Sequence, residues 1–159
     1  RLLIFEDGVW RHRRWQSLLV QAKLAKQESI EKPRMFPGLS VLCTPDAIVE
    51  IDGQFYIWEC KGVNGEEFKR IRESNVCPAR FVRRVHIYGG ATGLDKAIVH
   101  IDNKWSTDEY LVFVFDLNQK LVNEIVKRLV MLERAYMRYK KTKVLPDRCG
   151  NENCRCREI

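Results

Sequence analysis

Two runs rich in β-branched and aromatic residues, on either side of Asp52-Gly53, form the clearest hydrophobic pattern in the chain. Such runs around an Asp-Gly pair are typical of a β-hairpin with a two-residue turn. Counting back from that turn places Asp46 directly opposite Glu59 on the neighbouring strand. Since side chains alternate between the faces of a strand, Lys61 points the same way as Glu59. The pattern therefore predicts a patch on which two carboxylates and one ammonium converge.

The other elements follow from helical periodicities and from short apolar runs between turn residues. We predict a helix over residues 6–29, a loop over 30–38, a strand over 39–44, helices over 64–76 and from 78 to Gly89-Gly90, strands over 96–101 and 109–115, and a long helix over 116–141. This order implies an α/β fold with a central mixed β-sheet flanked by helices. Asp116 is the expected N-cap of the long helix, whose buried stripe should contain Leu121, Ile125, Leu129, Leu132, Tyr136 and Tyr139.

The two opposed carboxylates need a partner of opposite charge, because like charges directly opposite each other destabilise a sheet. Asp46, Glu59 and the backbone carbonyl of Cys60 would form a hard oxygen site suited to Mg²⁺ or Mn²⁺. Lys61 would then orient or deprotonate an attacking water and offset the charge of a phosphate. The alternative is an exposed hairpin with ordinary surface charges. Apolar residues on both faces of the hairpin favour the catalytic interpretation, with the charges at the mouth of a cleft.

Length, net charge and the distribution of apolar residues limit the classes of protein to which this chain can belong. The 159 residues suit one domain over residues 1–145, followed by a cysteine-rich tail over 146–159, and the net charge of +7 favours polyanion partners. No apolar run approaches the length of a membrane span, and no signal peptide is visible. We therefore expect a cytoplasmic protein without membrane contact. Because the first residue is Arg1 rather than Met, a missing native N-terminus is a further expectation.

Pro45-Asp46 stand before the predicted turn, and Glu59-Cys60-Lys61 stand after it. This arrangement resembles the signature of the PD-(D/E)XK nuclease superfamily, and the rest of the chain resembles RecB-like and YqaJ-like phage exonucleases, relatives of the iron–sulfur nucleases of CRISPR adaptation. The resemblance implies a restriction-endonuclease-like core and metal-dependent hydrolysis of DNA, at single strands or DNA ends. DNA is then the expected partner, with recombination or replication proteins as further partners, in a bacterium or a phage-infected host.

Two further motifs carry the resemblance. Gly8 and His12 match the GxxxH element of RecB-type nucleases, which implies that His12 completes the metal shell; a core histidine with a hydrogen-bond partner is the alternative. Arg84 and Tyr88 lie one helical turn apart, where that family carries a QxxxY element that contacts substrate. Arginine replaces the glutamine here, and its guanidinium is suited to holding a phosphate. Two other functions stay open: a DNA-binding module without turnover, and a restriction-type endonuclease.

Three cysteines, Cys149, Cys154 and Cys156, lie within eight residues of the tail. The resemblance implies a 4Fe–4S cluster at these thiols, and a small Zn²⁺ site is the alternative metal centre. Either would normally take four ligands, so Cys77 is the candidate for the fourth. A tail with free thiols is the remaining interpretation.

Overall fold

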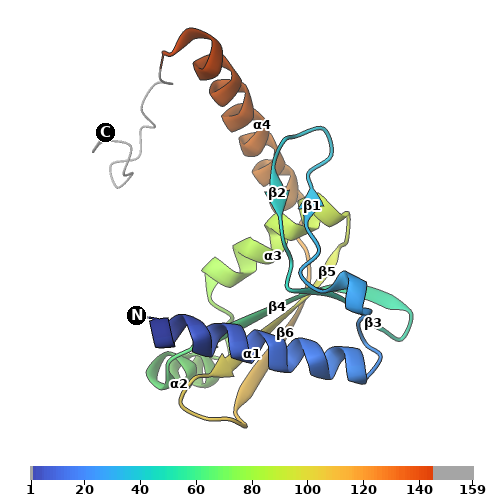
Figure 1. Cartoon of the computed structure of the whole chain (residues 1–159), viewed down its shortest axis with the longest axis vertical. Helices are drawn as coiled ribbons and strands as arrows, with labels where there is room; N and C mark the ends of the chain where they lie inside the picture. Colours follow the sequence, from blue (N-terminus) through green and yellow to red (C-terminus); the bar gives the residue numbers. More distant parts are fainter. Residues whose placement is uncertain (1, 145–159) are drawn as a thin grey trace.

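The computed structural model describes the backbone of residues 2–144 and the side chains of residues 8–144. Its elements follow one another as α1 (Leu2–Gln21), the 3₁₀ turn η1 (Gln27–Ser29), β1 (Arg34–Met35), β2 (Leu42–Cys43), β3 (Ala47–Ile51), β4 (Gln54–Val63), α2 (Gly65–Ser74), α3 (Ala79–Thr92), β5 (Lys96–Asn103), β6 (Tyr110–Asp116) and α4 (Gln119–Thr142) (Figure 1). The predicted α/β fold, a central mixed sheet flanked by helices, is confirmed. Within the described residues, every helix is too short or too polar to cross a membrane.

The main sheet has four strands in the order β3-β4-β5-β6. Strands β3 and β4 pair antiparallel, β4 and β5 parallel, and β5 and β6 antiparallel. The predicted hairpin register is confirmed, since Ile51 pairs with Gln54 across the turn. Asp52 and Gly53 both have positive φ, at 51° and 75°, as a type I′ turn requires. The turn chemistry therefore sets which residues of β3 and β4 lie opposite each other.

Helices cover both faces of this sheet. On one face, Trp15 and Leu19 of α1 pack against a buried cluster that contains Trp58 of β4. On the other face, α2 and α3 close the core with side chains that include Phe68, Ile71, Phe81, Val85 and Tyr88. Figure 1 shows α1 on one side of the strands and α3 with the start of α4 on the other. The predicted anchors of α2, Phe68 and Ile71, are both buried.

The segment before the hairpin differs from the prediction. Helix α1 ends at Gln21 rather than near residue 29, and the chain continues through a turn with a positive φ at Lys23. The predicted loop contains β1, and the predicted strand is reduced to β2. These two short strands pair with each other and not with the main sheet. A turn at Pro37-Gly38, where Gly38 has a positive φ of 72°, folds the chain back on itself.

The end of α3 and the start of α4 also differ from the prediction. Helix α3 continues through Gly89-Gly90 to Thr92 because the glycines serve close packing: a Cβ on Gly90 would lie 2.8 Å from the ring of Phe36. Asp116 ends β6, and the N-cap of α4 is Asn118, whose side chain accepts a hydrogen bond from the Leu121 amide. Asp116 instead pairs with Lys96 on the neighbouring strand.

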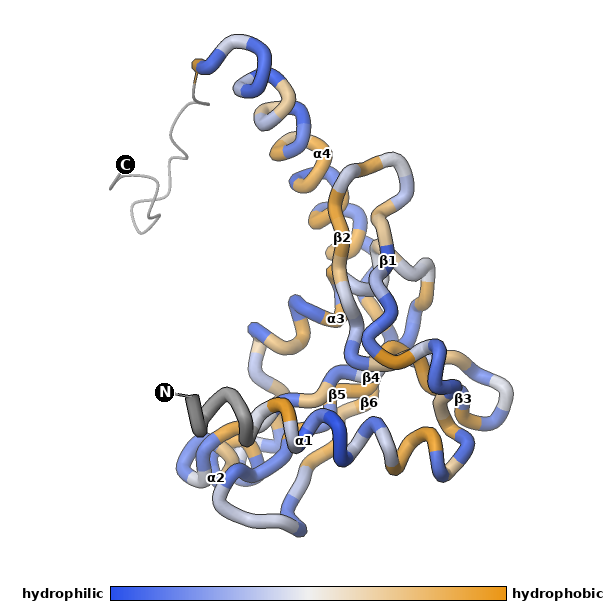
Figure 2. Tube along the Cα trace, in the orientation of Figure 1, coloured by the Kyte–Doolittle hydropathy of each residue, from blue (hydrophilic) through white to orange (hydrophobic). Residues whose placement is uncertain are grey.

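Helix α4 leaves the body of the molecule after its first turns (Figure 1). Val122 is buried against the core, but Leu132 and Tyr136 are 58% and 57% exposed. The buried stripe predicted for the whole helix is therefore wrong for its second half. Figure 2 shows apolar positions scattered along this projecting part of α4.

His100 of β5 lies in an aromatic cluster beneath α1. Its ring centroid is 4.1 Å from that of Trp15 and 5.1 Å from that of Tyr110, with which it stacks. Burial lowers the pKa of His100 from 6.5 to about 4, although the nearby carboxylate of Asp102 acts in the opposite direction. The imidazole is therefore neutral in the folded protein at neutral pH.

This burial predicts a pH-dependent stability. Because the folded-state pKa lies below the ordinary value, the unfolded chain binds the proton more tightly, and stability falls as the pH drops from 6.5 to 4. At pH 4 the loss from this one group should reach about 3 kcal/mol. Urea unfolding of the parent and of His100→Phe across this range measures it. Carboxylates remote from His100 titrate alike in both proteins, so equal pH dependence in the two would contradict the assignment.

Candidate active site

The predicted carboxylates meet at the open end of the hairpin. Asp46 immediately precedes β3, one residue beyond the last registered pair, in which Ala47 lies opposite Trp58. Its Oδ2 accepts a hydrogen bond of 2.8 Å from the backbone amide of Cys60 on β4. This bond holds the Asp46 carboxylate against the strand that carries Glu59. The two acidic residues therefore lie on neighbouring strands, as the hairpin register predicted.

Three oxygen atoms converge on the ammonium of Lys61. Its Nζ lies 2.6 Å from Glu59 Oε1 and 3.7 Å from Asp46 Oδ2. It also donates a hydrogen bond of 2.9 Å to the carbonyl oxygen of Cys60. These are the three oxygens that the sequence assigned to a metal ion. Their arrangement around one cationic atom shows that they can surround a positive charge together.

The position of Glu59 is electrostatically unfavourable for its ionised form. Its side chain is fully buried, and burial together with the charge of Asp46 raises the pKa of Glu59 to about 7, against the opposing effect of Lys61. The Oε2 atom has no hydrogen-bond partner among the described residues. A buried carboxylate oxygen without a partner carries an unmet desolvation cost. A divalent cation beside Glu59 would satisfy that oxygen and stabilise the ionised form.

The available donors fit a hard cation that retains bound water. Among the described residues, no group of three or more His, Cys, Asp and Glu side chains could hold a metal ion. The candidate set at the hairpin is instead two carboxylates and a backbone carbonyl. Mg²⁺ commonly takes one or two carboxylates and completes its octahedral shell with waters and substrate phosphate. The donor chemistry therefore suits Mg²⁺ or Mn²⁺ better than Zn²⁺.

Two residues of helix α1 also contact Asp46. His12 Nδ1 lies 3.6 Å from Asp46 Oδ1, too far for a hydrogen bond but near enough for an ionic contact when the ring is protonated. Gln16 donates hydrogen bonds to the Asp46 carbonyl, at 3.2 Å, and to Glu31 Oε1, at 3.0 Å. The amide of Glu31 also donates to the Asp46 carbonyl, at 3.1 Å. The backbone on which the carboxylate sits is thus fixed by two donors.

Sequence reasoning missed Gln16 and Glu31 as parts of this site. Gln16 carried a signal, since it follows His12 by one helical turn and shares its face. Glu31 carried none, because it lies in an irregular segment whose position depends on the fold. Sequence reasoning also gave no indication that Arg11 is buried, yet it is 6% exposed and forms an ion pair of 2.7 Å with Asp102.

Helix α3 brings the two predicted substrate-binding residues to the site. Arg84 Nη1 lies 3.4 Å from Glu59 Oε1, and its side chain is 52% exposed. Tyr88, one turn later, is buried in the core cluster. Burial and the neighbouring Glu59 raise the pKa of the Tyr88 hydroxyl well above its ordinary value. Arg84 therefore presents a cation to solvent beside the carboxylates, whereas Tyr88 supports the floor of the site.

The cysteines fall into two groups. Cys77 is buried where α2 passes into α3, and burial raises the pKa of its thiol to about 11. Cys149, Cys154 and Cys156 lie outside the described residues, so their predicted iron–sulfur or zinc site with Cys77 stays a prediction.

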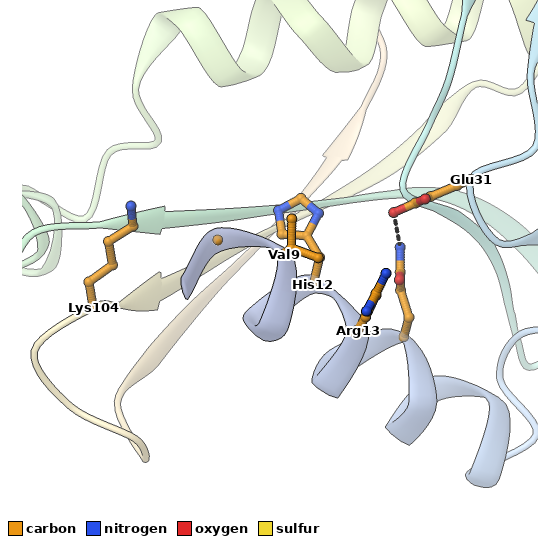
Figure 3. Close-up of a pocket in the computed structure, with 7 residues that line it drawn as sticks. Val9, His12, Arg13, Glu31 and Lys104 are labelled. Carbon is orange, nitrogen blue, oxygen red and sulfur yellow. Dashed lines mark hydrogen bonds between the residues drawn. The ribbon is translucent and has the colours of Figure 1, made fainter. Parts of the chain in front are cut away.

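A cavity of about 670 Å³ adjoins the site along α1 (Figure 3). It is lined by Gly8, Val9, His12, Arg13, Gln16, Glu31 and Lys104. Figure 3 shows the Lys104 and Glu31 side chains at opposite ends, with His12 between them. Arg13 lies toward the Glu31 end, so that end carries charges of both signs, and the cavity adjoins the candidate carboxylate of Asp46 through His12.

Solved structures share this fold at low sequence identity. An alkaline exonuclease (LHK-Exo) from Laribacter hongkongensis matches with a TM-score of 0.65 and 15% identity, covering 86% of this chain and 70% of that chain. The same enzyme in complex with dAMP gives the same values. The structure of SSO0001 matches with a TM-score of 0.54 and 16% identity; the match covers 79% of this chain and 59% of SSO0001, less than two thirds of its length. No protein-family model and no curated protein matches the sequence.

The geometry predicts a metal-dependent stabilisation. Mn²⁺ should raise the melting temperature of the parent, because an ion that binds only the folded state stabilises it. The shift should shrink below pH 7, where Glu59, with a pKa of about 7, becomes protonated. Thermal unfolding with Mn²⁺ and with EDTA, at pH 6 and pH 8, measures both effects.

Asp46→Asn should abolish the Mn²⁺ shift while leaving the fold intact. Asp116→Asn is the matched control, because it removes an exposed carboxylate at the opposite end of the sheet. A shift of equal size in Asp46→Asn and in the parent would place the ion elsewhere.

Proposed function

We propose that this chain is a metal-dependent deoxyribonuclease that hydrolyses phosphodiester bonds, acting on single strands or DNA ends. The observation that carries the proposal is the convergence of Asp46 Oδ2, Glu59 Oε1 and the Cys60 carbonyl on one cationic atom. The shared fold with an alkaline exonuclease supports the reaction class. The net charge of +7 supports a polyanionic substrate.

In this proposal, Asp46, Glu59 and the Cys60 carbonyl would hold Mg²⁺ or Mn²⁺, and His12, now 3.6 Å from Asp46 Oδ1, would move closer to complete the site. The bound ion supplies Lewis-acid polarisation of the phosphate and activation of water. As an ammonium, Lys61 would orient the attacking water and offset the charge that develops on the phosphate; only as a neutral amine would it take the proton of the water. Arg84, half exposed beside Glu59, binds a neighbouring phosphate oxygen through its planar guanidinium.

Cleavage of labelled DNA tests the proposal. The parent should degrade labelled single strands or duplex ends with Mn²⁺ and not with EDTA. Lys61→Ala should slow cleavage by roughly 10²- to 10⁴-fold, the usual contribution of a general acid or base, and Asp46→Ala should abolish it. Circular dichroism and DNA binding should stay close to those of the parent. The control Asp116→Asn should cleave like the parent.

Each result of the cleavage experiment that departs from these expectations leads to a different conclusion. Cleavage by Asp46→Ala at the parental rate would overturn the site assignment. DNA binding by the parent without any metal-dependent cleavage would identify a binding module on the nuclease fold. Discrete fragments from a long circular duplex would identify a restriction-type endonuclease instead of an exonuclease.

A further inference from the structure

The loop between β5 and β6 lies over the end of β4 and the start of α2. Two glycines beneath it make room for its side chains. A Cβ on Gly62 would lie 2.8 Å from Cε of Lys104, and a Cβ on Gly65 would collide with the indole of Trp105. The side chains of Lys104 and Trp105 therefore pack directly against the backbone of Gly62 and Gly65. Gly62 follows Lys61 on β4, and because side chains alternate along a strand, Lys104 packs on the α1 face of β4, opposite the face to which Lys61 points.

The loop is held in place by a buried arginine. Arg11 of α1 donates hydrogen bonds to the carbonyl of Lys104, at 2.9 Å, and to the carbonyl of Asn103, at 3.2 Å, besides its ion pair with Asp102. The Lys104 amide donates to the Val63 carbonyl at 2.8 Å. The backbone on both sides of the Lys104 carbonyl is thus tied to α1 and β4, and its side chains are presented from a fixed position.

The two side chains at the tip of this fixed loop are available to a ligand. The Trp105 side chain belongs to a residue that is 70% exposed, an unusual position for an indole. Lys104 lines the cavity that it shares with His12, and it forms no ion pair with a carboxylate within the described part of the chain. Figure 3 shows its ammonium at the end of that cavity away from Glu31. A free cation beside an exposed aromatic ring is the combination that binds unpaired nucleotides.

We propose that the β5–β6 loop binds a single strand of DNA as it leaves the catalytic carboxylates, with Lys104 on a backbone phosphate and Trp105 stacked on an unpaired base. This inference rests on the proposed nuclease function for its substrate. Charge supports the role of Lys104, because its ammonium forms no ion pair within the described residues and attracts a backbone phosphate to its end of the cavity. Stacking on Trp105 requires an unpaired base, so the loop favours single strands over duplex.

Binding measured in EDTA tests the loop separately from catalysis. Fluorescence anisotropy of a labelled single-stranded oligonucleotide reports the affinity of each variant in the Asp46→Ala background. Trp105→Ala should weaken binding by about 5- to 100-fold, and Trp105→Phe should restore most of the loss. Lys104→Ala should reduce the slope of log affinity against log salt by about 0.7, and Lys104→Arg should keep it.

Lys120→Ala is the matched control, because Lys120 is an exposed lysine on α4 beyond the opposite end of β5. It should bind the oligonucleotide with nearly the parental affinity. Parental affinity in both Trp105→Ala and Lys104→Ala, or no measurable single-strand binding by the parent, would overturn the inference. Weakened binding in the loop variants of a parent that never cleaves DNA would support the loop and contradict the proposed nuclease. Cleavage by the parent with unaltered binding in the loop variants would support the proposed nuclease and contradict the inference about the loop.

Discussion

The hydrogen bond from the Cys60 amide to Asp46 Oδ2 is the contact on which the candidate site depends. It continues the β3–β4 pairing by one residue with a side chain in place of a backbone carbonyl. The carboxylate is thereby fixed next to Glu59, and the Lys61 ammonium is the cation that contacts both acids. The raised pKa of Glu59 and its unsatisfied oxygen are the consequences of that placement. A fold optimised for stability alone would avoid this arrangement, so its presence favours a cation-dependent function.

Helix α1 connects this site to the rest of the molecule. Gln16 fixes the backbone of Asp46, and one turn earlier His12 approaches its carboxylate. On the preceding residue, Arg11 ties the β5–β6 loop to the same helix. A displacement of α1 would therefore disturb the carboxylates and the loop together. The cavity lined by α1 and Lys104 lies between these two parts.

Sequence reasoning succeeded where local chemistry fixes the geometry. The Asp52-Gly53 turn determines the hairpin register, and the register determines which acidic side chains meet. Sequence reasoning failed where contacts between residues far apart in the sequence determine the structure. The burial of Arg11 depends on Asp102, which is 91 residues away along the chain, and no local pattern indicates that pairing. The second half of α4 has helical periodicity, yet its Leu132 and Tyr136 are more than half exposed, so periodicity alone overestimated its burial.

The proposed chemistry requires that Asp46, Glu59 and the Cys60 carbonyl share one divalent cation. Anomalous diffraction from crystals soaked in Mn²⁺ tests it most directly, since the peak locates the ion independently of the protein. A shared ion should give a single strong peak about 2.0–2.3 Å from all three oxygens, with the Lys61 ammonium moved away from Glu59. A hairpin without such a peak, or a peak held by other residues while Lys61 keeps its contact with Glu59, would rule out a shared ion at this site.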